Sequence, residues 1–265
     1  MKVFISADIE GVTGISNWSQ ANHKERVYAT YAKRMSEEVK AAIDGAKAAG
    51  AQDIVVMDAH GTGVNLDIDI LGEGVTLIQG FNGHPDGMMY GLDETFDAAM
   101  MIGYHSPATY DGNPLAHTWS SSRIHKIVLN ETIASEWLLS AMTAAVRGVP
   151  TVFSSGDARL GEHIKALHED VVFHPTFSAR GASVVYTHPD ESTDAIRKLS
   201  EASLRKRVST MSVPDSFRIE ITFKHHVEAY RRHFYPGAVR TDDMSVAFES
   251  ADYDEILTFI AFMMV

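Results

Sequence analysis

The chain contains no cysteine among its 265 residues. Disulfide bonds and zinc sites built from thiolates are therefore excluded. It also has no apolar run that approaches the roughly 20 residues of a membrane-spanning helix. The first residues predict a strand and not a signal peptide, because Asp8 and Glu10 arrive before a long apolar stretch can develop. We therefore expect no membrane partner and a cytoplasmic location.

Basic residues are too few to balance the acidic ones. Lys and Arg number 23 and Asp and Glu number 35, which gives a formal net charge of -12. Such a surface repels the phosphates of nucleic acids and of anionic lipids, so neither is an expected partner. Histidine, by contrast, is abundant, with 13 residues. Without cysteine, a transition metal would have to be held by His, Asp and Glu, a set of donors that suits zinc, manganese or iron.

Strand-like and helix-like segments alternate along the first part of the chain. Apolar residues spaced by three and four predict a long helix over residues 24–49, which ends at Gly50, and a second helix over residues 133–146. Short apolar runs predict strands at residues 3–7, 54–57, 96–102, 126–129 and 151–153. This alternation predicts an α/β fold, with a mostly parallel sheet and helices on both faces in a Rossmann-like layering.

The last third has a different pattern. Residues 192–208 predict a polar helix, and residues 217–223 alternate like a half-exposed strand. A short strand is expected at residues 244–248. The final helix, residues 252–265, has a very apolar end that either docks on the core or packs on a neighbouring subunit. We therefore expect two domains, an α/β domain over residues 1–188 and a smaller α+β domain over residues 189–265, and leave open whether they interweave.

Potential metal ligands follow three of the predicted strands. The segments are Asp8-Ile9-Glu10-Gly11, Asp58-Ala59-His60-Gly61 and Gly103-Tyr104-His105-Ser106. Because sites in open α/β sheets gather beyond the carboxyl ends of the strands, these segments can converge. Asp8 and Glu10 face the same side of an extended chain, and two carboxylates so close repel each other unless a cation or a proton lies between them. Singly, each residue could be a turn former, a helix cap or a hydrogen-bonded histidine; the threefold repetition favours a metal site.

The order and spacing of these motifs resemble those of the D-aminopeptidase family associated with bacterial dipeptide transport, a group of zinc peptidases. The resemblance covers most of the chain and is least distinctive in the last third. It extends to Gly91-Leu92-Asp93, Leu115-Ala116-His117-Thr118, Ser135-Glu136 and Ser155-Gly156-Asp157. It implies two zinc ions per chain with Asp8 as the bridge, and His117 as the catalytic residue. The ligands that it implies are Asp8, Glu10, His60, His105 and Glu136.

The chemistry of these side chains fits what the resemblance implies. Five ligands with one shared carboxylate give each metal about three protein bonds and leave a position open for water. Two metals in such a site polarise a carbonyl and lower the pKa of a bound water. The sequence leaves open whether His117 acts as base, acid or nucleophile. Without the resemblance, Glu136 is equally well a first-turn acid that favours the helix dipole.

Other polar residues are weaker candidates. Asp58 and Asp157 either orient a ligand histidine by accepting its other ring N–H or belong to simple turns. Arg180 either meets a substrate carboxylate or forms a surface ion pair. His225, His226 and His233 lie outside the motifs and are expected at the surface. The segment 174–180 departs from the family pattern, which has a Lys near its start, and this departure bears on the choice of substrate.

Together these observations predict a metal-dependent aminopeptidase that acts on short peptides. The resemblance implies N-terminal D-amino acids in the substrate and a homo-oligomeric ring, with a decamer as one candidate size. Two alternatives stay open. One is a dinuclear hydrolase of another amide or of a phosphoester, although no phosphate-cradling glycine-rich loop is visible. The other is a non-catalytic peptide-binding homologue.

Overall fold

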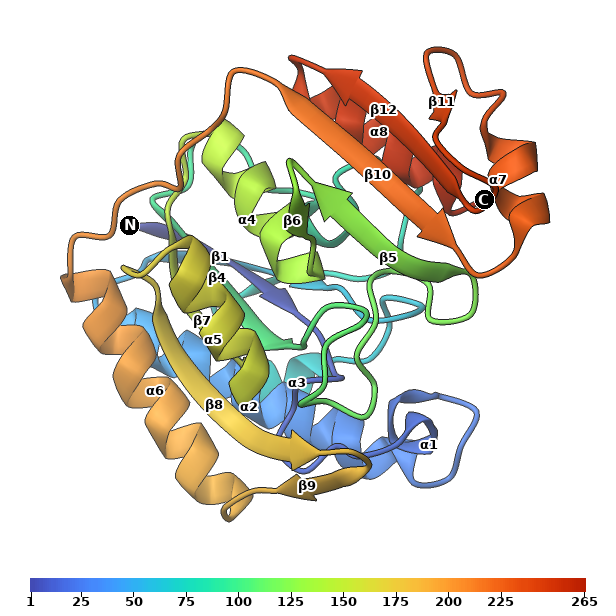
Figure 1. Cartoon of the computed structure of the whole chain (residues 1–265). Coiled ribbons are helices and arrows are strands. Elements are labelled where there is room, and N and C mark those ends of the chain that lie inside the picture. Colours follow the sequence, from blue (N-terminus) through green and yellow to red (C-terminus); the bar gives the residue numbers. More distant parts are fainter.

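The computed structural model describes residues 1–265, and a seven-stranded sheet organises most of them (Figure 1). All neighbouring strands are parallel except the last pair. In spatial order the strands are β3 (Thr76–Ile78), β2 (Asp53–Asp58), β1 (Lys2–Ala7), β4 (Ala98–Tyr104), β7 (Thr151–Asp157), β8 (Val172–Arg180) and β9 (Ser183–Val185). The predicted α/β fold with a mostly parallel sheet is confirmed.

The order of the strands reverses between β1 and β4. From β1 the sheet continues outward through β2 and β3, whereas from β4 it continues on the other side through β7 and β8. At such a switch point the loops that leave two neighbouring strands diverge, and a crevice opens beyond their carboxyl ends. Asp8 directly follows β1 and His105 directly follows β4. The crevice therefore lies between two of the predicted ligand segments.

Helices cover both faces of this sheet. The helical elements are α1 (Trp18–Ala21), α2 (Tyr28–Ala48), α3 (Ile68–Leu71), the 3-10 helix η1 (Gly87–Met89), α4 (Glu136–Val146), α5 (Ala158–Leu167), α6 (Pro189–Arg205), α7 (His226–Arg232) and α8 (Tyr253–Met263). Val3 and Ile5 of β1 point into a core shared with α2 and α6. Phe4 points the opposite way, into a core shared with α4 and α5. Because successive strand residues face opposite sides and both sides are covered, residues 3–5 of β1 are all apolar.

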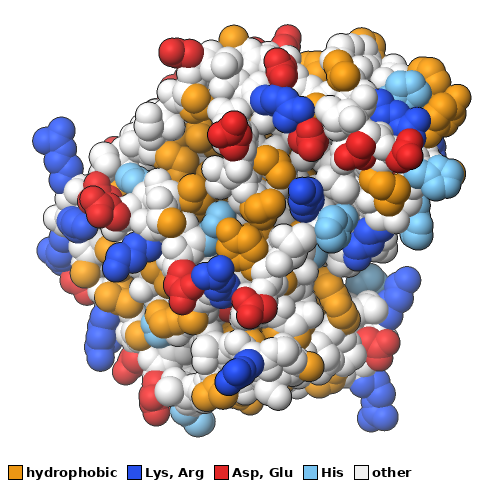
Figure 2. Space-filling model, viewed as in Figure 1, with side chains coloured by type: hydrophobic (Ala, Val, Ile, Leu, Met, Phe, Trp, Pro, Cys, Tyr) orange, Lys and Arg blue, Asp and Glu red, His pale blue; other side chains and the backbone are white.

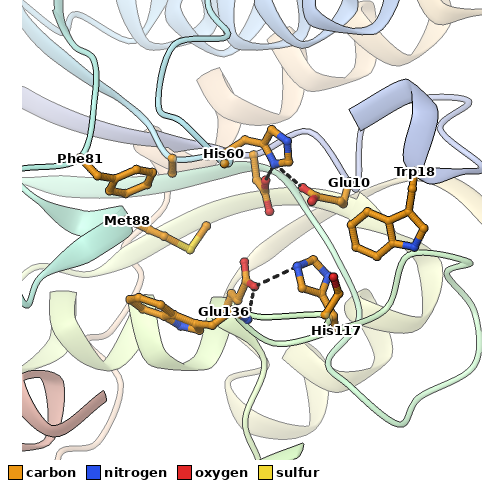
Figure 3. A pocket seen from close by; sticks show the side chains of 12 residues that line it. Glu10, Trp18, His60, Phe81, Met88, His117 and Glu136 are labelled. Atoms are coloured by element: carbon orange, nitrogen blue, oxygen red, sulfur yellow. Dashed lines mark hydrogen bonds and ion pairs between the residues drawn. The ribbon is translucent and has the colours of Figure 1, made fainter. Parts of the chain in front are cut away.

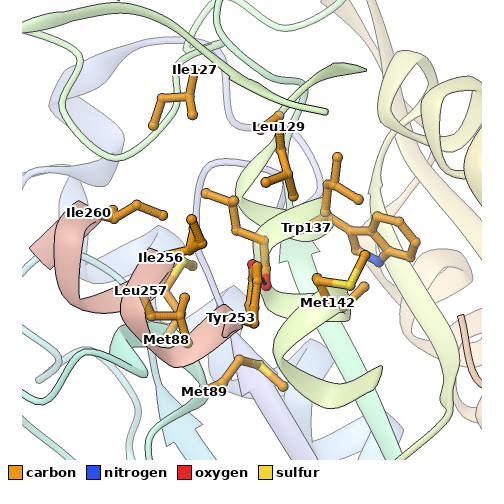
Figure 4. Packing of buried hydrophobic residues seen from close by; sticks show 14 of the residues in the cluster. Met88, Met89, Ile127, Leu129, Trp137, Met142, Tyr253, Ile256, Leu257 and Ile260 are labelled. Atoms are coloured by element: carbon orange, nitrogen blue, oxygen red, sulfur yellow. Dashed lines mark hydrogen bonds between the residues drawn. The ribbon is translucent and has the colours of Figure 1, made fainter. Parts of the chain in front are cut away.

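A second, antiparallel sheet packs over α4. Its strands, in spatial order, are β11 (Val239–Arg240), β12 (Ser245–Ser250), β10 (Phe217–Phe223), β5 (Ile124–Leu129) and β6 (Thr132–Ile133). Figure 4 shows Ile127 of β5 and Trp137 of α4 in one hydrophobic cluster with Ile256 and Leu257 of α8. Most of the apolar end of the chain thus docks on the core, as one of the two expectations for it proposed, whereas Phe262 and Val265 stay exposed.

The expected division of the chain at residue 188 stays a prediction, but two segments cross it. α6 follows residue 188 and yet packs on α2, beside the large sheet. β5 precedes it and yet pairs with β10 in the second sheet. Residues 126–129 are therefore a strand, as predicted, but they belong to the antiparallel sheet.

The bounds of the predicted helices shift by a few residues for local reasons. α6 begins at Pro189, because the His188 side chain caps its first turn and proline at the first helical position has no N–H to leave unbonded. α4 begins at Glu136 and not at residue 133, because the Ser135 hydroxyl accepts from the N–H of Leu138. No helix has both the length and the apolar character to cross a membrane; the cytoplasmic location stays a prediction.

Candidate metal centre

Glycines bring the ends of β1 and β4 unusually close together. The Gly11 N–H donates to the Gly103 carbonyl at 2.8 Å. A Cβ atom at Gly11 would lie 1.8 Å from the carbonyl oxygen of Tyr104, and one at Gly103 would lie 2.3 Å from that of Asp8. Gly103 also has a φ of +71°, which disfavours residues with a side chain. These contacts explain why both ligand segments contain glycine.

Asp8, Glu10 and His60 form the first group of possible ligands. The His60 Nδ1 atom lies 3.2 Å from Asp8 Oδ1 and 2.8 Å from Glu10 Oε2. Both carboxylates are buried, and His60 is nearly so. Their potential ligand atoms lie within 4.8 Å of one another, which is close enough for one ion.

His105, His117 and Glu136 form a second group of the same compactness. The His105 Nε2 atom lies 3.4 Å from Glu136 Oε2, and the His117 Nε2 atom lies 3.6 Å from Glu136 Oε1. The two imidazole rings stack, with 4.4 Å between their centroids. Figure 3 shows Glu136 and His117 facing Glu10 and His60 across the cavity. His117, expected as a catalytic residue, is thus also within reach of a metal.

Asp8 connects the two groups. Its Oδ1 atom faces His60, and its Oδ2 atom lies 3.5 Å from His105 Nε2. The Asp8 Oδ2 and His105 Nε2 atoms are buried and have no hydrogen-bond partner. An unpaired buried polar atom is costly, and a shared cation would remove that cost at both atoms. One carboxylate between two groups of donors fits a bridging ligand.

The three histidines are held in the tautomer that metal binding needs. In each ring one nitrogen donates to a backbone carbonyl: His60 Nε2 to Ala21 and His117 Nδ1 to Leu115, both at 2.8 Å, and His105 Nδ1 to Ser106 at 2.9 Å. A carbonyl oxygen only accepts, so the bonded nitrogen carries the hydrogen. The other nitrogen faces the carboxylates and can offer its lone pair to a cation.

The pKa values of the site are shifted because its charged groups are buried away from water. Burial raises the pKa of Asp8 well above its usual value, and the neighbouring Glu10 adds to this effect. Burial also opposes the ionisation of Glu10, but His60 beside it holds the pKa of Glu10 well below its usual value. Burial would lower the pKa of His105, yet Glu136 and Asp8 raise it to about 10. Such mutual perturbation is typical of functional sites, and a bound cation would stabilise the carboxylates in the ionised form.

A cavity of about 380 Å³ opens over these residues, within the range of small-ligand sites. All members of the two ligand groups except His105 form its polar wall. Its remaining large side chains are apolar, and sequence reasoning did not single them out: Trp18, Phe81, Met88 and Trp119. None of them lies in a metal-ligand motif, and no periodic pattern marks them.

Asp58 and Asp157 do not orient ligand histidines. Asp58 accepts from the backbone N–H groups of Asn65 and Leu66 and so holds the loop after His60. Asp157 caps α5 and accepts from the N–H of Ser106 beside His105. The carbonyl groups described above take the ring N–H bonds instead, so the first of the two expectations for these residues is wrong. Arg180 is exposed and does not line the cavity.

Comparisons with known proteins give matches over nearly the whole chain. The model of the family Peptidase_M55, described as D-aminopeptidase, matches residues 1–262. A D-aminopeptidase of Bacillus subtilis (strain 168) is 26% identical over 256 residues, which are 95% of this chain and 92% of that protein. The structure of the Zn-dependent D-aminopeptidase DppA from Bacillus subtilis, described as a self-compartmentalizing protease, superposes with a TM-score of 0.93. It has 25% sequence identity and covers 99% of this chain and 96% of that one.

Proposed function

This chain belongs to the peptidase M55 family of D-aminopeptidases and is a metallo-aminopeptidase, and we propose that it removes N-terminal D-amino acids from short peptides at a centre of two zinc ions. The position of Asp8, with one oxygen toward each group of ligands, is the observation that carries the dinuclear centre. Zinc is proposed because the donors are imidazoles and carboxylates and because the similar Bacillus subtilis enzyme depends on it.

Each ion would have about three protein ligands, which leaves room for water or substrate. Asp8, Glu10 and His60 would hold one ion, and Asp8, His105 and Glu136 would hold the other. When bound, such a pair supplies a Lewis acid for the scissile carbonyl and lowers the pKa of water. The residues themselves fix the geometry, since every ligand is buried or nearly so and each histidine is anchored to a backbone carbonyl.

His117 is the proposed proton carrier. Burial lowers the pKa of His117, and the neighbouring His105 lowers it further. The neutral ring is therefore favoured near pH 7. Its Nδ1–H is engaged by the Leu115 carbonyl, so Nε2 is the atom that accepts a proton from the attacking water. The same nitrogen then donates that proton to the leaving amine. Glu136 Oε1, 3.6 Å from Nε2, stabilises the protonated ring in between.

Zinc content tests the centre. Wild-type protein should hold two zinc ions per chain, and Asp8→Ala should lose at least one, because it removes the shared ligand. His117→Ala should retain both ions but lose activity by roughly 10²- to 10⁴-fold, the usual contribution of a general acid or base. Asp53→Ala, which changes an exposed aspartate at the start of β2, is the matched control. One ion or none in the wild type would contradict the dinuclear centre; loss of zinc in His117→Ala would make His117 a ligand.

A substrate panel separates the remaining functions. Dipeptides with D- or L-residues at the amino end and aryl phosphoesters should be compared in zinc-loaded protein. We expect hydrolysis of the D-peptides alone. Cleavage of phosphoesters alone would overturn the peptidase proposal, and unchanged rates in His117→Ala would favour the non-catalytic, peptide-binding alternative.

We also propose that the protein is a homo-oligomer. An apolar patch surrounds α7 and the C-terminus, and Figure 2 shows hydrophobic side chains and histidines gathered at this end of the molecule. Its exposed members are Val227, Tyr230, Phe234, Val239, Phe262 and Val265. Patches of this kind on a protein surface mark sites of interaction, and the similar Bacillus subtilis enzyme is self-compartmentalizing. A second copy of the chain is therefore the proposed partner.

Light scattering after size exclusion measures the assembly. Phe234→Asp should lower the molar mass, whereas Val185→Asp, at an exposed apolar residue outside the patch, should not. A monomeric wild-type protein would refute the proposal.

A further inference from the structure

The apolar side chains of the cavity lie at two ends of the ligand cluster. Figure 3 shows Phe81 and Met88 to one side of the metal-ligand side chains and Trp18 to the other. Trp18 packs edge-on against the catalytic His117, with 5.2 Å between ring centroids. A substrate bound across the cluster would therefore meet an apolar surface on each side of the bond to be cleaved.

The end with Phe81 and Met88, called the closed end below, has a buried floor, while Phe81 itself is 43% exposed. Met88 and Ala59 are buried at 7% and 4% exposure and form its floor. The other end is open, because Trp18 also borders a second cavity of about 290 Å³, which shares His60 and Gly61 with the first. An aminopeptidase needs space for one residue on the amino side and a free path for the rest of the peptide. The closed end therefore suits the first residue, and the open end suits the remaining chain.

Trp119 completes the closed end, and its placement is built into the backbone. It has a φ of +64°, a conformation that is unfavourable for a residue with a side chain. The backbone N–H of Trp119 donates to Glu136 Oε1 at 2.6 Å, which ties Trp119 to the ligand cluster. Its indole packs so closely over Gly87 that a Cβ there would lie 2.7 Å from Cη2. The ring is thus fixed beside Met88, which directly follows Gly87 in the chain.

The Phe81 end of the first cavity favours neutral, apolar groups, whereas the second cavity is lined mainly by polar residues such as Asn22, His23 and Asn65. Among the residues around both cavities there is no lysine or arginine. A substrate carboxylate therefore finds no cationic side chain in the lining, whereas a large side chain finds a wall of two aromatic rings and a thioether.

Resting on the proposed D-aminopeptidase function, we propose that Phe81, Met88 and Trp119 form a pocket for the side chain of the first residue. This pocket selects peptides that begin with a bulky apolar D-residue, such as D-phenylalanine or D-leucine, over those that begin with D-alanine. The peptide beyond the scissile bond passes Trp18 into the second cavity. Selection arises because a small side chain leaves the aromatic wall in contact with water.

The test compares D-Ala-Gly, D-Leu-Gly and D-Phe-Gly, which share one leaving group, with the zinc-loaded enzyme. We expect kcat/KM for D-Phe-Gly to exceed that for D-Ala-Gly by at least about tenfold, the least that apolar pockets achieve for such differences. Phe81→Ala should lower this ratio severalfold, mainly through KM, and Phe81→Leu should restore most of it. Val213→Ala, which alters an equally exposed apolar residue (43%) away from the cavity, should leave activity and ratio unchanged.

Equal or better hydrolysis of D-Ala-Gly by the wild type would overturn the pocket while supporting the peptidase function. A ratio that does not change in Phe81→Ala would overturn the assignment of the wall. If none of the three peptides is cleaved, the proposed function fails instead. Calorimetry with free D-phenylalanine and D-alanine then tests the pocket directly, since only tighter binding of D-phenylalanine agrees with it.

Discussion

Replacing Glu38 by glutamine should stabilise this protein at neutral and alkaline pH. Glu38 lies in α2 and is only 2% exposed. Its Oε1 atom accepts the N–H of Thr13 at 2.9 Å, while Oε2 is buried without a hydrogen-bond partner. Burial raises the pKa of Glu38 from 4.5 to about 7, against a smaller opposing effect of the bonds from Thr13. Glutamine keeps the acceptor for Thr13 and has no charge to bury.

The size and sign of the effect follow from proton linkage. Between pH 4.5 and 7 the folded protein binds more protons at this residue than the unfolded chain, so the free energy of unfolding falls as the pH rises. Each pKa unit corresponds to about 1.4 kcal/mol, so the rise from 4.5 to about 7 gives a total loss that approaches about 3.5 kcal/mol well above pH 7. Between pH 5 and pH 8 the wild type should lose about 2.5 kcal/mol from this group alone. Glu38→Gln should lack that component.

Urea unfolding at pH 5, 6, 7 and 8 measures the contribution of Glu38 to the free energy of unfolding. A chelator is present, so that zinc binding does not contribute. The ligand carboxylates and histidines titrate alike in both proteins, so the difference between variant and wild type isolates Glu38. We expect that difference to grow by about 2.5 kcal/mol toward pH 8. Glu25→Gln, which changes an exposed glutamate outside α2, serves as the control and should show a much smaller trend. A difference that changes by less than about 1 kcal/mol, or that shrinks toward pH 8, would refute the reasoning.

Three further changes test other parts of the structure. Gly11→Ala should abolish zinc binding and cost about 1–3 kcal/mol or more in urea unfolding, because its Cβ would collide with a carbonyl oxygen at the end of β4. Gly181→Ala has open space around it but a φ of +59°, so it should cost about 1–2 kcal/mol through backbone strain and keep the zinc. Zinc retained in Gly11→Ala, or lost in both variants, would refute the steric cause. Arg232→Met should cost about 1–3 kcal/mol, because the buried guanidinium donates to the backbone carbonyl of Met263, whereas the exposed neighbour in Arg231→Met should be nearly neutral. Chelation should lower the melting temperature reversibly, since zinc at 1,000 times its Kd adds about 4 kcal/mol, and an unchanged melting temperature would contradict a zinc centre that stabilises the fold.

The sequence allowed the central layer and the candidate ligands to be predicted because both depend on local signals. Apolar runs mark buried strands, and polar residues directly after them mark the carboxyl edge of the sheet. Asp8, His60 and His105 all lie in such positions. The resemblance added Glu136, which is an ordinary first-turn acid by its local pattern and reaches the site because α4 begins beside the end of β4.

Elements that depend on distant partners could not be predicted in the same way. β5 is recognisable as a strand, but its pairing with β10 joins residues about 90 positions apart, and no local pattern encodes that choice. β8 was missed because it contains Pro175 and lacks a regular alternation of buried and exposed residues. Asp157 marks the end of a strand in the sequence, yet its role as the cap of α5 depends on a helix that was not predicted.

The metal ligands and the substrate walls have different structural origins, which explains why only the ligands were visible in the sequence. Four of the five proposed ligands (Asp8, Glu10, His60 and His105) follow strands of the large sheet, so the backbone of the sheet positions them. Phe81 and Trp119 lie in irregular segments, where tertiary contacts decide the conformation. Trp119 belongs both to the metal centre and to the substrate wall. Its backbone N–H donates to Glu136 Oε1, and its ring forms part of the wall. A change of its side chain should therefore affect the choice of substrate, whereas loss of its N–H would reach the metal centre through Glu136.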